Sequence, residues 1–224
     1  MPDPDLIRRR RVEIERELEA AAAIAGGSPA RLLAAVKYLA AEDLPALAEA
    51  GVRLVGENRV EQLIEKQAVV GEPFEWHFIG HLQSRKARDL IGRVTLVHSL
   101  SSLSAAERLQ RFAEQPVRCL VEVNVAGEAS KSGVATAGLD AFLDALASLD
   151  RIAVDGLMTM PPLAESAEAS RGAFAALREL AASLEASYAG RFSFGELSMG
   201  TSQDYAVAAE EGATIVRVGS TLVT

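Results

Sequence analysis

The 224-residue sequence predicts an α/β fold, a single (β/α)8 barrel with one extra helix at its N-terminus. Two observations lead to this prediction. Short apolar segments, typical of buried parallel strands, alternate with longer stretches in which apolar residues have helical spacing. Neither a composition break nor a low-complexity linker interrupts the alternation, and the length is sufficient for one large core. We therefore expect one domain over residues 1–224.

The predicted elements follow each other in strict order. The strands are Leu32–Val36, Val52–Gly56, Trp76–Ile79, Val94–Val97, Val117–Val125, Ile152–Met158, Phe192–Leu197 and Thr214–Val218. The helices between them are Glu42–Ala50, Asn58–Val70, Ser84–Ile91, Ser102–Glu114, Ala137–Leu149, Glu165–Tyr188 and Ser202–Glu211. Such alternation means parallel strands, and the number fits a barrel slightly shorter than the roughly 250 residues typical of this fold. An open doubly wound sheet is the alternative, but it predicts a glycine fingerprint after the first strand, where the sequence has none.

Residues 1–27 precede the first strand and are predicted to form the extra helix. Apolar residues within Asp3–Ala25 are spaced to share one face, and Gly26-Gly27 ends the helix. Because the sequence stops at Thr224, soon after the eighth strand, we expect this helix to replace the one that would follow that strand.

Composition and charge narrow the class of partner and the compartment. The net charge of −8 argues against nucleic-acid and anionic-membrane partners, which favour a basic face. The lone cysteine, Cys119, lies in an apolar run and is expected to be a small core residue in a reducing cytoplasm. The N-terminus lacks the apolar core of a signal peptide, and no stretch is long enough to span a bilayer. We expect a soluble, cytoplasmic protein.

Polar residues and glycines collect where the predicted strands end, which is where the active site of a barrel lies. These positions are Lys37, Glu57-Asn58-Arg59, Gly80-His81, His98-Ser99, Asn124, Met158 to Pro161, Met199 to Ser202, and Arg217 to Thr221. A scaffold alone does not require polar residues at strand end after strand end.

Lys37 ends the first predicted strand, directly after five apolar residues. A buried ammonium loses its hydration, so it needs a partner or gives up its proton and becomes a nucleophile. At the carboxyl end of a barrel strand, that amine would lie where ligands bind. The alternative is that Lys37 is the first solvated residue after the strand.

The last two strand ends suggest a phosphate site. Gly200-Thr201-Ser202 precedes a predicted helix, so Ser202 is expected to cap it while backbone N–H groups point outward. The small residues Gly219 and Ser220 allow an anion to approach their N–H groups closely. Barrels often bind phosphate at the loops after strands seven and eight. The alternative is an ordinary cap and an ordinary turn.

Arg217 shares side-chain parity with Ile215 in the last strand, so it points into the barrel and must meet an anion or a good acceptor. A structural salt bridge to Glu122 is the alternative. The histidines His77, His81 and His98 do not complete a zinc ligand set, and we expect no metal.

An amine that forms an imine, a phosphate cup and an arginine between them describe a site for pyridoxal 5′-phosphate (PLP). A lysine-imine aldolase would use the same amine and cup, but it does not need Arg217.

Several segments, in order, resemble the PLP homeostasis protein family. They are Gly56-Glu57-Asn58, Trp76–Ser84 with Lys86-Ala87, Val97-His98-Ser99, Glu122–Val125, Ser130–Gly133, Gly156-Leu157-Met158, Leu197–Gly200 and Val216–Gly219. The resemblance runs from about residue 30 to the end, and the Trp76–Ser84 block is highly specific. It implies a single barrel similar to the N-terminal domain of alanine racemase. It also implies a role in PLP supply, without an established catalytic reaction.

The resemblance further implies roles for individual residues. PLP would be bound as an imine to Lys37, with its phosphate held by Ser202 and the Gly219-Ser220 backbone. Arg217 would lie near the pyridine nitrogen. Three further residues would line the pocket: Asn58, His81 and Met199. The implied partners are PLP and PLP-dependent apoenzymes, and we expect a monomer.

The sequence departs from the family in places. Val36 and Leu39 stand where the family usually has Ser or Thr before the lysine and a second lysine after it, which puts hand-off through a second amine in doubt. A PLP-dependent amino-acid racemase remains the alternative function. Racemisation needs acid–base groups on both faces of the cofactor, and Tyr38, Tyr188 and Tyr205 match no such position. We therefore favour a binding protein over an enzyme.

Overall fold

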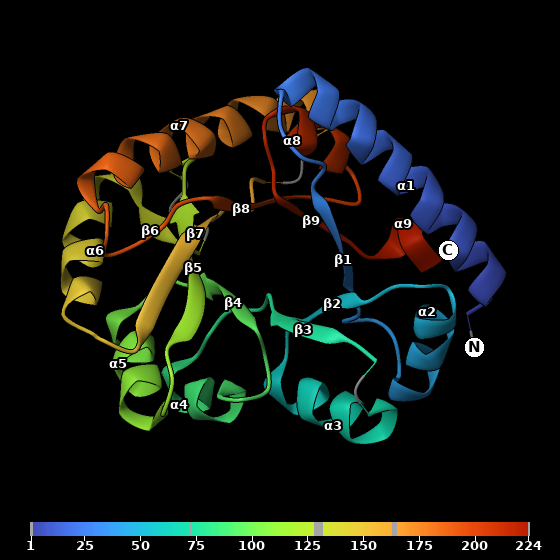
Figure 1. Cartoon of the computed structure of the whole chain (residues 1–224), viewed down its shortest axis with the longest axis horizontal. Coiled ribbons are helices and arrows are strands. Elements are labelled where there is room, and N and C mark those ends of the chain that lie inside the picture. The colour runs from blue at the N-terminus through green and yellow to red at the C-terminus, as the bar shows by residue number, and fades with distance from the viewer. Residues whose placement is uncertain (1, 72, 128–131, 163–164, 224) are drawn as a thin grey trace.

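The computed structural model describes residues 2–71, 73–127, 132–162 and 165–223. Nine strands, all paired in parallel, form one sheet in the order β4-β3-β2-β1-β9-β8-β7-β5-β6. An additional pairing of β4 with β5 closes eight of these strands into a barrel, and the short β6 adds to β5 outside the ring. Figure 1 shows the barrel with its helices around the outside. The predicted fold class is confirmed.

The strands are β1 Arg31–Ala35, β2 Leu54–Glu57, β3 Glu75–Phe78, β4 Leu96–Leu100, β5 Val117–Asn124, β6 Val134–Ala135, β7 Ile152–Met158, β8 Glu196–Thr201 and β9 Ile215–Val218. The α-helices are α1 Pro4–Ala25, α2 Leu44–Glu49, α3 Val60–Val70, α4 Ser84–Ala87, α5 Leu103–Phe112, α6 Leu139–Ala147, α7 Arg171–Ser187, α8 Tyr205–Glu210 and α9 Ser220–Val223. Short 3-10 turns extend several of them. The sequence does not predict β6 or α9, which are too short to show a periodic pattern.

Strand β8 begins four residues after its predicted start. The prediction relied on the apolar pair Phe192 and Phe194, but their rings pack at 5.8 and 6.2 Å from the ring of Tyr188, beyond the end of α7. Aromatic burial under a helix end satisfies the same hydrophobic pattern as a strand. The later start brings Met199 and Gly200 inside the strand rather than after it.

Strand β4 is shifted in the same direction, from a predicted Val94–Val97 to Leu96–Leu100. Its five residues are all buried, His98 and Ser99 included. His98 has the side-chain parity of Leu96, so it faces the barrel interior rather than lying beyond the strand end.

Two hydrophobic layers hold the structure, because alternate strand residues face opposite sides of the sheet. The interior of the barrel contains Leu33, Leu54, Leu96, Leu120, Met158 and Ile215, with Ile79 packed against them. A larger cluster lies between the outer face of the strands and the helices. Residues that share interior parity beyond the leucine layer include the polar His98 and Arg217.

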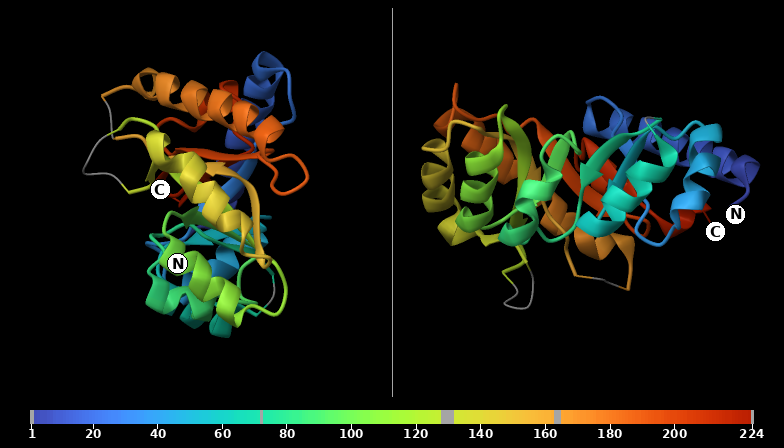
Figure 2. Two further views of the ribbon diagram at one scale, coloured as in Figure 1. Left: turned by 90° about the vertical axis from the view of Figure 1, so that its left-hand side faces the viewer. Right: turned by 90° about the horizontal axis from the view of Figure 1, so that it is seen from below.

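Helix α1 covers the barrel where a helix after β9 would otherwise lie. The Asp3 carboxylate caps it by accepting the N–H of Asp5, and Gly26 ends it with a left-handed φ of 72°. The helix packs against α8 and α9, as expected for a substitute final helix. The right-hand view in Figure 2 places the start of α1 and α9 on one side of the barrel. In the described part of the chain, no helix has both the length and the apolar character needed to cross a membrane.

Candidate functional site

Lys37 lies in the turn that follows β1, at the carboxyl end of the barrel. Its side chain is exposed, and Nζ lies 4.7 Å from the centroid of the neighbouring Tyr38 ring, which is itself exposed. Of the two alternatives for Lys37, the structure therefore agrees with the one in which it is the first solvated residue after the strand. The apolar run ends with the buried Val36, and the chain turns outward directly after it. Lys37 is accessible to a ligand from solvent.

A buried ion pair holds the end of β1, and the sequence analysis missed it. Lys66 of α3 donates from Nζ to the Val36 carbonyl at 2.7 Å and to the Glu57 carboxylate. Its side chain is 4% exposed and that of Glu57 is 0% exposed. The other oxygen of Glu57 accepts the N–H of Asn58 at 2.6 Å. The pair thus links β1, β2 and α3 next to Lys37.

A signal for this pair exists in the sequence. The buried residues of α3 are Val60, Leu63 and Lys66, so a lysine occupies the apolar stripe of an amphipathic helix. A charged residue at such a position requires a buried partner.

The turns after β2 and β3 meet at Asn58 and Gly80. A Cβ on Gly80 would lie 2.0 Å from the carbonyl oxygen of Asn58, so only glycine permits this contact. His81 follows directly and is exposed at the same end of the barrel. The structure therefore brings Asn58 and His81 together through their backbones, as neighbours of the β1 end.

The loops after β8 and β9 are joined by hydrogen bonds. Gly219 donates its N–H to Ser202 Oγ at 3.1 Å, and Thr221 Oγ1 donates to the Ser202 carbonyl at 3.5 Å. The predicted cap at Ser202 is wrong, because α8 begins at Tyr205 and Asp204 occupies the N-cap position. Ser202 Oγ accepts from Gly219 and keeps its own hydrogen for donation.

This pair of loops lies next to the end of β1. Ala34 pairs with Val218 in the barrel, and a Cβ on Gly219 would lie 3.3 Å from the Ala35 carbonyl oxygen. The β9 loop therefore approaches the backbone that leads to Lys37. Gly219 and Ser220 begin this loop, and Ser220 is the first residue of α9.

Arg217 is 6% exposed and faces the barrel interior. It donates from Nη1 to Ser198 Oγ at 2.6 Å and from Nη2 to the Thr159 carbonyl at 3.0 Å. Burial lowers the pKa of Arg217 to about 10, and the carboxylates of Asp204 and Glu122 oppose this effect. Arg217 is thus a buried cation at neutral pH. The ion pairs found among the described residues do not join it to Glu122, whose Oε1 accepts from Ser132.

Met199 does not lie where the resemblance implies. It is 0% exposed and belongs to the cluster between strands and helices. Its neighbour Ser198 bonds Arg217 inside the barrel, and successive strand residues face opposite sides. The side chain of Met199 therefore packs behind β8 instead of facing the polar groups.

The three histidines separate into two places. His77 and His98 bond each other inside the barrel, whereas His81 is exposed at the carboxyl end. Among the described residues, no three metal-ligating side chains gather at one point. Ser130-Lys131, part of a segment that resembles the family, lies outside the described residues.

Comparisons with known proteins identify the family. A family model described as the alanine racemase N-terminal domain matches residues 11–224. The chain is 41% identical over 201 residues to the pyridoxal phosphate homeostasis protein of Aquifex aeolicus, with 88% of this chain and 87% of that protein covered. PipY of Synechococcus elongatus, solved with PLP bound, is 33% identical with a TM-score of 0.85, and 97% of this chain and 100% of PipY are covered.

Alanine racemase of Corynebacterium glutamicum has a TM-score of 0.72 at 21% identity and shares the fold, with 99% of this chain and 61% of the racemase covered. The family assignment rests on the sequence identity to the homeostasis proteins and on the share of the chain that the identity covers. The chain belongs to the pyridoxal phosphate homeostasis protein family, within the wider group built on the alanine racemase N-terminal domain.

Proposed function

We propose that this chain binds PLP as an imine on Lys37 and serves PLP homeostasis, without a catalytic reaction of its own. One observation carries the proposal. An accessible amine, a hydroxyl-lined pair of loops and a buried cation lie at the ends of β1, β8 and β9, which are neighbours in the barrel. The relatives named for PLP homeostasis, and PipY with PLP bound, support it.

The donor set fits this cofactor. PLP supplies an aldehyde for an amine, a phosphate and a pyridine ring that withdraws electrons. Lys37 provides the amine, and Ser202 Oγ, which accepts from Gly219 and keeps its own hydrogen, would donate to a phosphate held beside the Gly219-Ser220 backbone. Arg217 provides a positive charge for the pyridine nitrogen. Asn58 and His81 flank the site from the β2 and β3 turns, and Met199 supports β8 from behind.

Chemical trapping tests the imine. Borohydride reduction of the protein incubated with PLP should give a stable adduct on the peptide that contains Lys37. The chain has four lysines, so mapping by mass spectrometry is unambiguous. Lys37→Ala should abolish the adduct and the visible absorption of bound PLP. Lys86→Ala, which removes an amine on the surface near Glu61, is the matched control and should leave both unchanged. A colourless parent protein, or an adduct at another lysine, would contradict the proposal.

Ser202→Ala should weaken PLP retention by about 1–3 kcal/mol, because the phosphate loses a charge-assisted hydrogen bond. That is roughly 5- to 150-fold in the dissociation constant. The imine should still form at saturating PLP. Equilibrium dialysis measures the change. Ser187→Ala, at the far end of α7, is the control. Equal affinity of the Ser202 variant and the parent would leave Ser202 with the role of joining two loops.

We propose further that the protein is a cytoplasmic monomer that passes PLP to PLP-dependent apoenzymes. The exposure of Lys37, together with that of Tyr38 (81%) and Met160 (50%), supports access by another protein. Restored activity of an apoenzyme mixed with the PLP-loaded chain, faster than with free PLP at equal concentration, tests the transfer.

A racemase-type activity is the alternative, favoured by the alanine racemase family model. Tyr188 and Tyr205 speak against it. Tyr188, directly after α7, donates to Asp144 at 2.9 Å, and Tyr205 of α8 donates to Glu17 at 2.7 Å, so both hydroxyls bond outer helices. Chiral analysis of L-alanine incubated with the PLP-loaded protein distinguishes the two functions, and accumulation of D-alanine would favour the racemase.

A further inference from the structure

A chain of polar side chains crosses the barrel interior and ends at Arg217. Glu75 Oε1 lies 3.0 Å from His77 Nε2, and His77 Nδ1 lies 2.8 Å from His98 Nε2. His98 Nδ1 lies 2.8 Å from Ser198 Oγ, which accepts from Arg217. The two histidines and Ser198 are at most 1% exposed, whereas the side chain of Glu75 is 43% exposed. The chain connects solvent at the amino-terminal mouth with the arginine of the candidate site.

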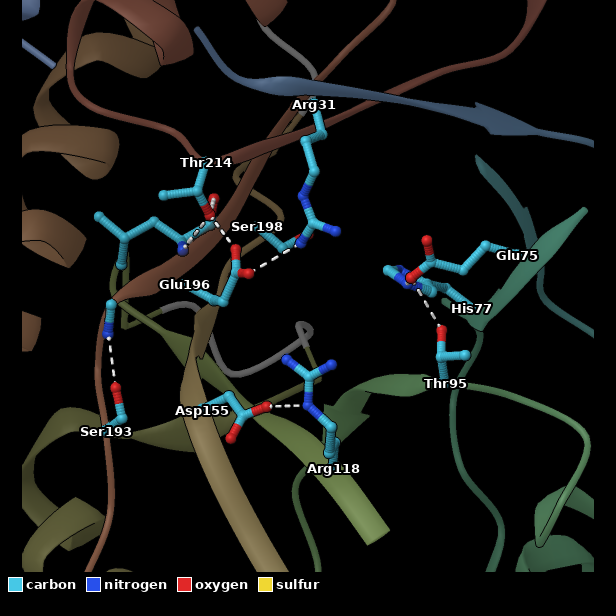
Figure 3. A network of polar contacts seen from close by, with 12 residues as sticks. Arg31, Glu75, His77, Thr95, Arg118, Asp155, Ser193, Glu196, Ser198 and Thr214 are labelled. Atoms are coloured by element: carbon cyan, nitrogen blue, oxygen red, sulfur yellow. Dashed lines mark hydrogen bonds and ion pairs between the residues drawn. The ribbon is translucent and has the colours of Figure 1, made fainter. Parts of the chain in front are cut away.

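Figure 3 shows the mouth where this chain begins. Glu75 and His77 lie beside Thr95, whose hydroxyl donates to Glu75 at 3.0 Å. Two ion pairs lie around the same mouth, Arg31 with Glu196 and Arg118 with Asp155. Glu75 is thus one of several carboxylates at this mouth, and it is the one that bonds a histidine.

With both histidines neutral, the two ends determine which atom donates at every step. Arginine only donates and an ionised carboxylate only accepts. Arg217 therefore donates to Ser198, and Glu75 accepts from His77 Nε2–H. Between them, Ser198 donates to His98 Nδ1, and His98 Nε2–H donates to His77 Nδ1. Each link then holds one proton, each histidine is neutral, and all the donors point from Arg217 toward Glu75.

The electrostatic surroundings agree with neutral histidines. Burial lowers the pKa of His77 and holds the pKa of His98 well below its usual range. The nearby cations Arg31, Arg118 and Arg217 act in the same direction, and the Glu75 carboxylate opposes them at His77. The pKa of Glu75 is itself lowered, through its hydrogen bonds from His77 and Thr95, which outweigh the effect of burial.

We propose that Glu75, His77, His98 and Ser198 form a one-directional hydrogen-bond relay that positions Arg217 and makes it respond to the carboxylate at the opposite mouth. They are positioning residues, because they act on the cofactor through Arg217, and in that respect the inference rests on the proposed function. The Ser198 hydrogen is committed to His98, so the Ser198 oxygen is left to accept from Arg217. This fixes the guanidinium between Ser198 and the Thr159 carbonyl.

The residue types in this hydrogen-bonded series favour a relay over a role in packing alone. Apolar side chains occupy the neighbouring interior positions, and buried polar groups are destabilising unless all are satisfied. A barrel that needed only packing would carry leucine here as well. A fully bonded polar network instead specifies one arrangement.

Nitrogen-15 NMR of the histidines tests the proton order directly, with or without PLP. His77 and His98 should both be neutral Nε2–H tautomers at neutral pH, because burial lowers the pKa of each. Glu75→Gln should disturb this order, because an amide both donates and accepts and so permits the reverse direction. The Nδ1–H form of His98 should then become detectable. PLP should still map to Lys37, but should dissociate about two- to tenfold faster, as for loss of one oriented hydrogen bond.

Glu196→Gln is the matched control, since it removes a carboxylate from the same mouth but not from the relay. It should leave the His98 signals and PLP dissociation unchanged. If Glu75→Gln leaves the His98 signals and the rate of PLP dissociation unchanged, the relay is overturned. The four side chains would then serve only to pack the barrel interior. A protonated His77 or His98 at neutral pH would also overturn the relay.

Variants at Ser198 test the end of the relay next to Arg217. They also keep the proposal testable if Glu75→Gln does not fold. Ser198→Ala should speed PLP dissociation, and Ser198→Thr, which keeps the hydroxyl, should restore the parent rate. Equal rates in all three proteins would again overturn the relay. Failure of the parent protein to form the Lys37 adduct would reject the proposed function instead, while the tautomers would still report on the relay.

Discussion

Replacing Glu57 with alanine is expected to destabilise the folded chain by about 3–5 kcal/mol, the usual effect of leaving a buried charge without its partner. Lys66 is almost fully buried and donates to Glu57 and to the Val36 carbonyl. Without the carboxylate, the ammonium loses its counter-charge, and the N–H of Asn58 loses its acceptor. Urea unfolding, followed by far-UV circular dichroism, measures the change.

Two further proteins make this result specific. Glu61→Ala removes a carboxylate from α3, the helix that carries Lys66, but from the exposed ion pair with Lys86, and should unfold near the parent midpoint. Glu57→Leu with Lys66→Met should be less destabilised than Glu57→Ala, because no uncompensated charge remains. A Glu57→Ala protein as stable as the Glu61 variant would show that the buried pair does not hold the end of β1.

Arg217→Glu is expected to keep PLP on Lys37 but to raise the rate of slow transamination of added amino acids by about tenfold or more. The size follows because a rise of one unit in the pKa of the pyridine nitrogen increases its protonated fraction by about tenfold. PLP withdraws electrons best when this nitrogen is protonated, and a guanidinium beside it disfavours a second positive charge. A carboxylate there would join Asp204 and Glu122, which already act on this position. Single-turnover conversion of bound PLP to pyridoxamine phosphate is the readout.

The control for this experiment is Arg217→Lys, which keeps a positive charge and should convert PLP as slowly as the parent. Arg217 bonds Ser198 and Thr159 inside the barrel, so each variant is first compared with the parent by thermal unfolding. Equal conversion rates in folded Arg217→Glu and in the parent would mean that Arg217 holds the barrel together and does not set the electronics of the cofactor.

The sequence by itself determined the barrel, because its pattern is local. Apolar runs of strand length alternate with helical spacing, and each strand end is followed by a polar residue or a glycine within a few positions. Lys37, Ser202 and Arg217 were found in this way. The pattern does not fix a strand boundary where an apolar segment has two ways to be buried. Phe192 and Phe194 satisfy the same pattern by packing against Tyr188, and β8 therefore begins later than the pattern predicts.

Only the tertiary structure decided how residues distant in the chain meet. Lys66 and Val36 are 30 residues apart, and His98 and Ser198 are 100 apart, so no spacing rule connects them. Closure of the barrel brings their strands together, and the parity of each strand selects which side chains turn inward. That parity places Arg217 and Ser198 in the interior and Met199 behind the sheet. Because β8 begins and ends later than the sequence pattern predicts, the residues that lie beyond the strand, where they can reach a ligand, also differ from the predicted ones.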